Sequence, residues 1–125
     1  MGVADARSIL VLEEQGAIAA LITDMLQGMG HRVVGPADRF SEALRLLVEH
    51  EVDAAILDVK IEGELAIPVA EELVRRGIPW VFATGDMPKA LENRYARVPV
   101  LSKPFSAEHL RAVLSELLDR PSRDA

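Results

Sequence analysis

Ala54-Ala55-Ile56-Leu57-Asp58 is a run of four apolar residues that ends in a carboxylate. Three other short apolar runs end in polar side chains in the same way: Ile9-Leu10-Val11-Leu12 before Glu13-Glu14, Trp80-Val81-Phe82-Ala83 before Thr84-Gly85, and Val98-Pro99-Val100-Leu101 before Ser102-Lys103-Pro104. Strands that are apolar along their whole length are typical of a parallel sheet with both faces covered. We therefore interpret the four runs as parallel strands of one sheet.

Helical patterns alternate with these strands. A fifth strand is predicted over residues 31–35, stopped by Gly35-Pro36, and residues 60–65 are expected to form a loop. Apolar residues at helical spacing lie within residues 18–26, 43–48, 69–74 and 110–118, with a short helix expected within 88–94. Ser41 and Ser106 are candidate N-caps, Pro68 suits a first helical turn, and Gly77 suits a helix end. The pattern predicts an α/β fold with five parallel strands and five helices.

Composition narrows the classes of protein that fit this chain. The chain has 125 residues, half of them hydrophobic, and a formal net charge of −6. We expect a single domain with its core at about residues 7–118 and a polar tail over residues 119–125. An acidic chain without basic clusters is not expected to bind nucleic acid, and no apolar stretch is long enough to cross a membrane. With no cysteine and no signal-peptide pattern, the sequence indicates a cytoplasmic protein.

The polar residues at the strand ends indicate a common site. Because parallel strands present their carboxyl ends at one edge of a sheet, these side chains are expected to converge there. The converging groups are the carboxylates of Glu13, Glu14 and Asp58, the Thr84 hydroxyl and the Lys103 ammonium. Such a set suits a divalent cation, which prefers oxygen ligands, together with a phosphoryl group.

These motifs, taken in order, resemble the receiver domain of two-component response regulators over about residues 7–118. The resemblance implies a flavodoxin-like, doubly wound sheet with strand order 2-1-3-4-5. Phe82-Ala83-Thr84-Gly85, preceded by Gly77-Ile78-Pro79, is similar to a subgroup of stand-alone receivers known mainly from alphaproteobacteria. In that subgroup a Tyr often follows the Thr-Gly pair, whereas this chain has Asp86.

The resemblance implies a role for each residue of the site. Asp58 would be the phosphoacceptor, and Thr84 and Lys103 would bind the phosphoryl oxygens after transfer. Mg²⁺, or Mn²⁺, would be held by three carboxylates and one backbone carbonyl, namely those of Glu13, Glu14, Asp58 and Lys60. The Lys103-Pro104 peptide bond is expected to be cis. The protein would catalyse its own phosphorylation and dephosphorylation without being a turnover enzyme.

Three further residues are expected to modulate the site. Gly85 would keep the approach to the phosphoryl group open. Lys60 and Asp86 would flank its entrance, where they either pair and slow attack by water or remain two separate solvated charges.

The resemblance also implies partners. The phosphoryl donor would be a sensor histidine kinase or a histidine phosphotransfer protein. A downstream protein would bind the face formed by helix four, strand five and helix five, and the chain would be a monomer or a weak dimer.

Two positions depart from the usual receiver pattern. Glu14 stands where the family usually has Asp, and it is one methylene longer. Val100 stands where many receivers carry Tyr or Phe, so the usual aromatic switch is absent. Tyr95 either takes over that role or is a half-buried loop aromatic.

Two other readings of the sequence remain open. One is a pseudo-receiver that binds a protein partner without phosphorylation. The other is a flavodoxin-like or phosphohydrolase domain, although the chain has no P-loop or GxGxxG motif and no evident separate acid or base. The three histidines, His31, His50 and His109, lack metal-ligand spacing.

Overall fold

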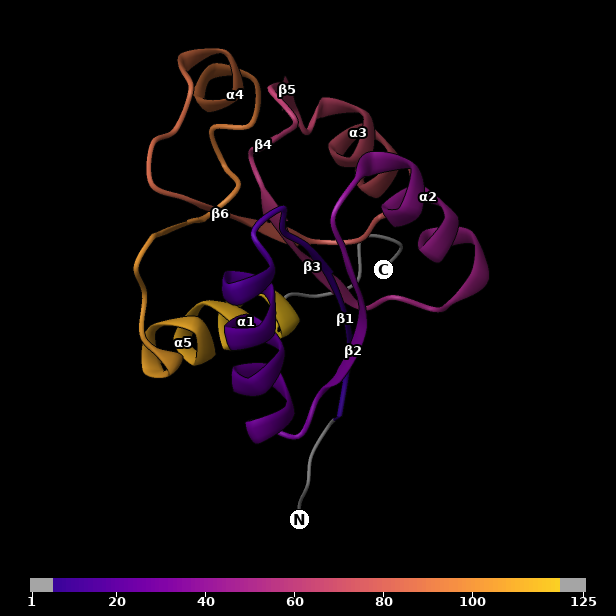
Figure 1. Cartoon of the computed structure of the whole chain (residues 1–125), viewed down its shortest axis with the longest axis vertical. Helices are drawn as coiled ribbons and strands as arrows, with labels where there is room; N and C mark the ends of the chain where they lie inside the picture. The colour runs from indigo at the N-terminus through magenta and orange to yellow at the C-terminus, as the bar shows by residue number, and fades with distance from the viewer. Residues whose placement is uncertain (1–5, 120–125) are drawn as a thin grey trace.

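The computed structural model of the chain describes residues 6–119 and contains a parallel sheet of five strands (Figure 1). The strand order is β2-β1-β3-β6-β7, which confirms the predicted order once two short extra strands are set aside. The strands of this sheet are β1 Ser8–Leu12, β2 Arg32–Ala37, β3 Ala54–Asp58, β6 Trp80–Thr84 and β7 Val100–Ser102. Of the expected polar tail, only Asp119 lies within the described residues.

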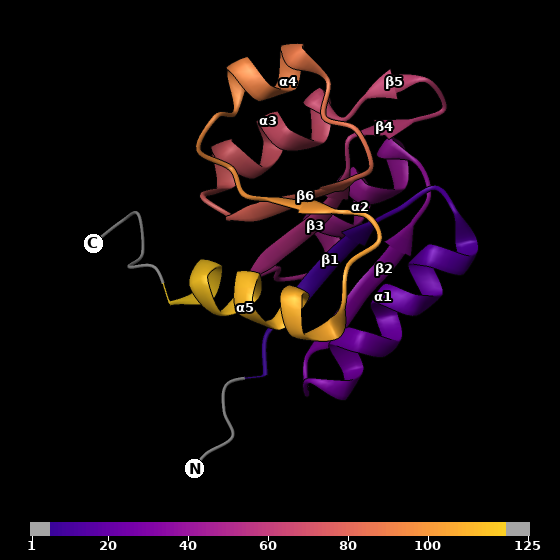
Figure 2. The same ribbon diagram turned by 90° about the vertical axis from the view of Figure 1, so that its left-hand side faces the viewer.

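Five helices cover the two faces of the sheet, as predicted. They are α1 Gly16–Gly28, α2 Phe40–Glu49, α3 Ile67–Arg76, the short α4 Lys89–Arg94 and α5 Ala107–Leu118. Figure 2 shows α1 and α5 on one side of the sheet and α3 and α4 on the other, and buried residues of α2 join the α3 side. Successive strand residues alternate between the two apolar layers, because side chains alternate across a pleated strand.

The helix ends follow the sequence signals with one exception. Pro68 lies in the first turn of α3, and Gly77 ends that helix with a φ of 71°. The Ser106 hydroxyl accepts a hydrogen bond from the His109 N–H and caps α5. Ser41, by contrast, is inside α2, which begins at Phe40 and has no side-chain cap.

β2 does not stop at Gly35-Pro36, as the sequence suggested, but continues to Ala37. The pairing register shifts there, since Leu10 is opposite Val34 whereas Leu12 is opposite Ala37. Gly35 has a φ of 102°, and the Gly35-Pro36 bond is cis. The bulge brings the Ala37 carbonyl within 2.9 Å of the Glu13 N–H, so it fixes the backbone where the polar site begins.

Residues 60–65, expected to be a loop, form a small hairpin. Its strands are β4 Lys60–Ile61 and β5 Glu64–Leu65, and the Ala66 N–H closes its base by donating to the Val59 carbonyl. Glu62 and Gly63 make the two-residue turn with φ values of 51° and 81°. Positive φ at both positions is what a type I′ turn requires, and Gly63 meets it without a steric cost.

Some helical residues expected to face the core are exposed. Val48 in α2 is 73% exposed, and Leu21 and Val74 are also on the surface. The helices bury narrower stripes than the sequence pattern suggested. Within residues 6–119, no helix has the length and apolar character needed to cross a membrane.

Gly35→Ala is expected to destabilise the fold by roughly 1–3 kcal/mol, because a side chain is strained at this φ. An added Cβ would also lie 2.7 Å from the Ala37 nitrogen. Chemical denaturation of both proteins measures the difference. Gly28→Ala is the matched control: an added Cβ there meets nothing within 4 Å, and little loss is expected. Equal losses in the two variants would contradict this account of Gly35.

Candidate functional site

Strand alternation determines which polar side chains meet at the carboxyl edge. Glu13, Asp58 and Lys103 each lie two residues beyond a strand residue that packs in the α1–α5 layer: Val11, Ile56 and Leu101, respectively. Their side chains therefore continue toward the same layer. Three residues far apart in the sequence are brought together in this way. The Lys103 N–H also donates to the Thr84 carbonyl over 2.9 Å, which extends the β6–β7 pairing to the site.

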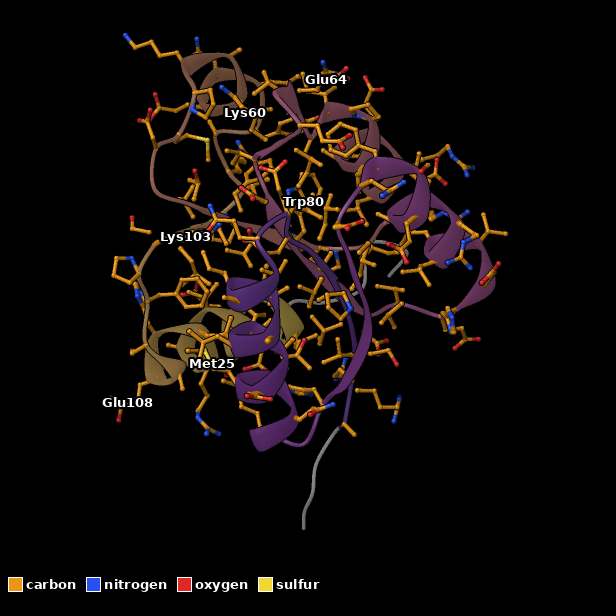
Figure 3. The ribbon with its side chains drawn as sticks, in the orientation of Figure 1. Met25, Lys60, Glu64, Trp80, Lys103 and Glu108 are labelled. Atoms are coloured by element: carbon orange, nitrogen blue, oxygen red, sulfur yellow. The ribbon has the colours of Figure 1, made fainter. Side chains whose placement is uncertain are left out.

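The Lys103 ammonium lies between two carboxylates. Its Nζ is 2.6 Å from Glu13 Oε1 and 3.6 Å from Asp58 Oδ2. Glu13 is only 2% exposed, and its other oxygen accepts the Gln15 N–H over 3.0 Å. A buried carboxylate needs such partners to stay ionised. Lys103, labelled in Figure 3, directly follows β7 in the chain, and the predicted cis bond between Lys103 and Pro104 is confirmed.

The acidic surroundings perturb Asp58. Burial of its carboxyl group and the neighbouring negative charge of Glu13 raise the pKa of Asp58 to about 6, although the Lys103 ammonium and the Lys60 amide act in the opposite direction. Without additional positive charge, this carboxyl is therefore partly protonated just below neutral pH. A bound cation would favour its ionised form.

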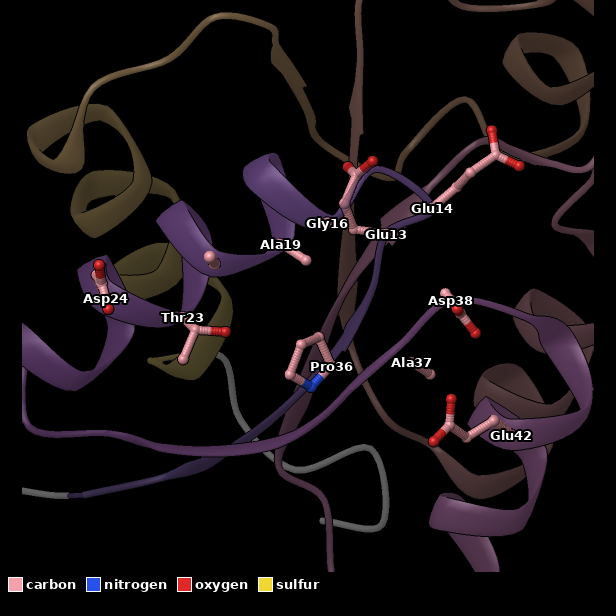
Figure 4. A pocket seen from close by; sticks show the side chains of 11 residues that line it. Glu13, Glu14, Gly16, Ala19, Thr23, Asp24, Pro36, Ala37, Asp38 and Glu42 are labelled. Carbon is pink, nitrogen blue, oxygen red and sulfur yellow. The ribbon is translucent and has the colours of Figure 1, made fainter.

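Glu14 does not join Glu13 and Asp58. It is exposed, and its Oε1 accepts the Glu62 N–H at the tip of the β4–β5 hairpin over 2.5 Å. Figure 4 shows the Glu13 and Glu14 side chains leaving the chain in different directions, just after β1 ends and where the chain bends at Glu14. Among residues 6–119, no three His, Cys, Asp or Glu side chains surround a common metal position. The metal-ligand role of Glu14 stays a prediction.

Thr84 and its neighbours border the same edge. The Thr84 hydroxyl donates to the Asp86 carbonyl and accepts the Asp86 N–H, so it is held within its own turn. Gly85 is exposed and leaves the approach open. Lys60 and Asp86 are both exposed and form no ion pair with each other among residues 6–119. This arrangement corresponds to the two separate solvated charges.

An aromatic cluster lies on the other face of β6. The rings of Trp80, Phe82 and Tyr95 meet edge to face, with centroids 5.5 Å apart for Trp80 and Tyr95 and 6.0 Å for Phe82 and Tyr95. The Arg94 guanidinium covers Tyr95 and pairs with Glu71 of α3. Val100, by contrast, is 41% exposed on β7. Tyr95 is therefore part of the packing between α4 and β6.

An open groove of about 690 Å³ borders the acidic residues (Figure 4). One wall is α1, including Ala19 and Thr23, and the other follows the β2 bulge, including Pro36. Five carboxylates line it: Glu13, Glu14, Asp24, Asp38 and Glu42. The sequence pattern does not predict this groove, because one wall of the groove depends on the continuation of β2 to Ala37.

The donor set at Glu13 and Asp58 fits a magnesium ion. Mg²⁺ usually takes one or two protein carboxylates and completes its shell with water or phosphate oxygens. The Lys103 ammonium already occupies the position of a cation between these two carboxylates. These two carboxylates can therefore hold a divalent ion without a third carboxylate.

Comparison with known proteins identifies the family. Residues 9–115 match the response regulator receiver domain. The chain belongs to this family. SdrG from Sphingomonas melonis Fr1 is 38% identical and superposes with a TM-score of 0.82, over 93% of this chain and 99% of SdrG. A second structure of SdrG, described as its BeF3-activated conformation, superposes with a TM-score of 0.77.

Two other relatives are longer than this receiver. PhyR from Bartonella quintana, described as an anti-anti-sigma factor, is 26% identical with a TM-score of 0.79, over 92% of this chain and 48% of PhyR. The transcriptional regulatory protein PdtaR from Mycobacterium tuberculosis is 32% identical over 83% of this chain and 53% of PdtaR. The chain thus spans about half the length of the curated relatives it matches.

The raised pKa of Asp58 predicts that the stability difference between Asp58→Asn and the unsubstituted protein depends on pH. Because the pKa is raised on folding, the folded receiver holds more protons than the unfolded chain between about pH 4 and 6, and its stability falls as pH rises through that window. Asp58→Asn is expected to be more stable than the unsubstituted protein at pH 7.5, by on the order of 1–3 kcal/mol.

Urea denaturation at several pH values, without divalent cations, measures this difference. It should shrink steadily as the pH is lowered to about 4. A difference that does not change with pH would show that the Asp58 carboxyl titrates normally.

Proposed function

We propose that this receiver accepts a phosphoryl group on Asp58 in a Mg²⁺-dependent reaction. The observation that carries the proposal is the pair of Asp58 and Glu13 with Lys103 between them. The donor would be a phosphohistidine of a sensor kinase or a phosphotransfer protein. The bond from phosphorus to the imidazole nitrogen breaks as a bond to an Asp58 carboxylate oxygen forms, and water later hydrolyses the acyl phosphate.

Each residue of the site has a specific part in this proposal. Glu13 and Asp58, with the Lys60 carbonyl, would hold the metal, which offsets the repulsion between Asp58 and an anionic donor. The Lys103 ammonium would exchange its contacts with the two carboxylates for contacts with the phosphoryl oxygens. Thr84 would exchange its hydrogen bonds within the Asp86 turn for one to the phosphoryl group. The chain would then be a phosphoacceptor and not a turnover enzyme.

The output of the proposed switch is a protein contact. The face of α4, β7 and α5 would bind a downstream partner, consistent with the description of PhyR as an anti-anti-sigma factor. We propose that the chain works as a cytoplasmic receiver of the Phe-Ala-Thr-Gly subgroup. Its 38% identity to SdrG supports a receiver of this kind.

A second candidate function is a pseudo-receiver that binds its partner without phosphorylation. The position of Glu14 favours it, because this carboxylate contacts the hairpin and not the other two acids. Phosphorylation of the purified protein distinguishes the two functions.

Incubation with Mg²⁺ and a small phosphodonor is expected to add the mass of one phosphoryl group to the intact protein. The gain should disappear with EDTA and in Asp58→Asn. Asp53→Asn is the matched control: Asp53 lies at the opposite edge of the sheet, where its carboxylate accepts the Ser8 N–H, and an amide oxygen preserves that bond. The absence of a mass gain, with partner binding retained, would favour the pseudo-receiver.

Tyr95 is expected to transmit the state of Thr84 to α4. Thr84 shares a face of β6 with Phe82 and Trp80, which contact Tyr95. Since Trp80 is the single tryptophan, its fluorescence should change when BeF3⁻ and Mg²⁺ bind, and Tyr95→Leu should reduce the change at least about twofold. His109→Leu is a control, because His109 is exposed on α5. The same change in Tyr95→Leu would show that Tyr95 only fills space.

A further inference from the structure

The β4–β5 hairpin is joined to the metal site at both of its ends. Its first residue, Lys60, lies two positions after Asp58 and carries the carbonyl assigned to the metal. Its tip is joined by the hydrogen bond from the Glu62 N–H to the Glu14 carboxylate. One small element therefore connects the Lys60 carbonyl, which the proposed function assigns to Mg²⁺, with Glu14, which the sequence predicts as a further metal ligand.

The contact at the tip involves an unfavourable backbone conformation. Glu62 has a φ of 51°, a left-handed conformation that is costly for residues other than Gly, Asn and Asp. A charge-assisted hydrogen bond to its N–H favours the turn in which that N–H points outward. Glu14 thus helps to hold the hairpin in the observed conformation.

The length of the side chain at position 14 suits this contact. A Glu carboxylate reaches one methylene further than that of Asp, the residue usually found here in receivers. In the observed conformation the Glu14 carboxylate lies at the hairpin tip, and among residues 6–119 no third acid joins Glu13 and Asp58.

We propose that Glu14 is shared between two alternative partners, the hairpin tip and a divalent cation, so that metal binding releases the β4–β5 hairpin. In the metal-free protein, Glu14 anchors Glu62. When Mg²⁺ binds at Glu13 and Asp58, the excess positive charge draws the Glu14 carboxylate inward, and the Glu62 N–H loses its acceptor. This inference rests on the proposed metal site and adds a positioning role for Glu14.

Amide hydrogen exchange at Glu62, followed by NMR, tests the proposal in four variants. Without metal, Glu14→Ala should exchange about three- to tenfold faster than the unsubstituted protein, the change expected for one hydrogen bond of ordinary net strength. Glu14→Gln keeps a neutral acceptor of the same length and should stay protected. Glu14→Asp is too short and should resemble Glu14→Ala. Glu64→Gln, an exposed acid in the same hairpin, is the control.

Mg²⁺ provides the second arm of the experiment. It should accelerate exchange at Glu62 in the unsubstituted protein to about the rate of Glu14→Ala, and it should have little effect in Glu14→Gln, because an amide is a weaker ligand. If Mg²⁺ shifts the Asp58 and Glu13 resonances but leaves Glu62 protected, the shared role is wrong and the metal site stands. If Mg²⁺ shifts neither resonance, the proposed metal site is wrong. The proposed sharing of Glu14 between the hairpin and the metal is then wrong as well.

Discussion

A carboxylate as buried as Glu13 requires a compensating charge, and the Lys103 ammonium supplies it at 2.6 Å. This ion pair joins the residues that directly follow β1 and β7, on either side of Asp58 at the end of the central strand β3. It places a cation beside the candidate phosphoacceptor. Asp58 is held less tightly, because its oxygen is 3.6 Å from the same ammonium and because the charge of Glu13 opposes its ionisation. One ammonium thus lies near two carboxylates. When both carboxylates are ionised, the site has a net negative charge that favours binding of a cation.

The polar residues at the carboxyl edge of the sheet come from both sides of the sheet. Glu13, Asp58 and Lys103 belong by alternation to the layer of α1 and α5, whereas Thr84 belongs with Trp80 and Phe82 to the layer of α3 and α4. A phosphoryl group on Asp58 would be bound from both sides. It would therefore link two layers that the sheet otherwise separates, and Tyr95 lies where that link would reach α4.

The architecture could be predicted because apolar runs and the helical spacing of apolar residues are visible within short stretches of sequence. The same signals locate Glu13, Asp58, Thr84 and Lys103 at one edge. They do not show that β2 continues through Gly35-Pro36, since such a dipeptide usually ends a strand and only the pairing with β1 reveals the bulge. The hairpin after Asp58 was also missed, because its turn places a Glu in a conformation that Glu rarely adopts. The divergence of Glu13 and Glu14 was not predicted, because both residues lie beyond β1, where the chain bends at Glu14 and the strand period no longer applies.

Because the Glu13 and Glu14 side chains point in different directions, substitutions at the two positions have different effects. Exchanging their roles would require a one-residue slip of β1, which would turn its buried residues to the wrong layers. Each acid therefore varies independently of the other. Position 13 is constrained by the ammonium that neutralises it, while position 14 is free to differ in length, charge or polarity with the charge balance of the interior intact. A lineage of such receivers could adjust its response to divalent ions through a single surface residue, at little risk to folding.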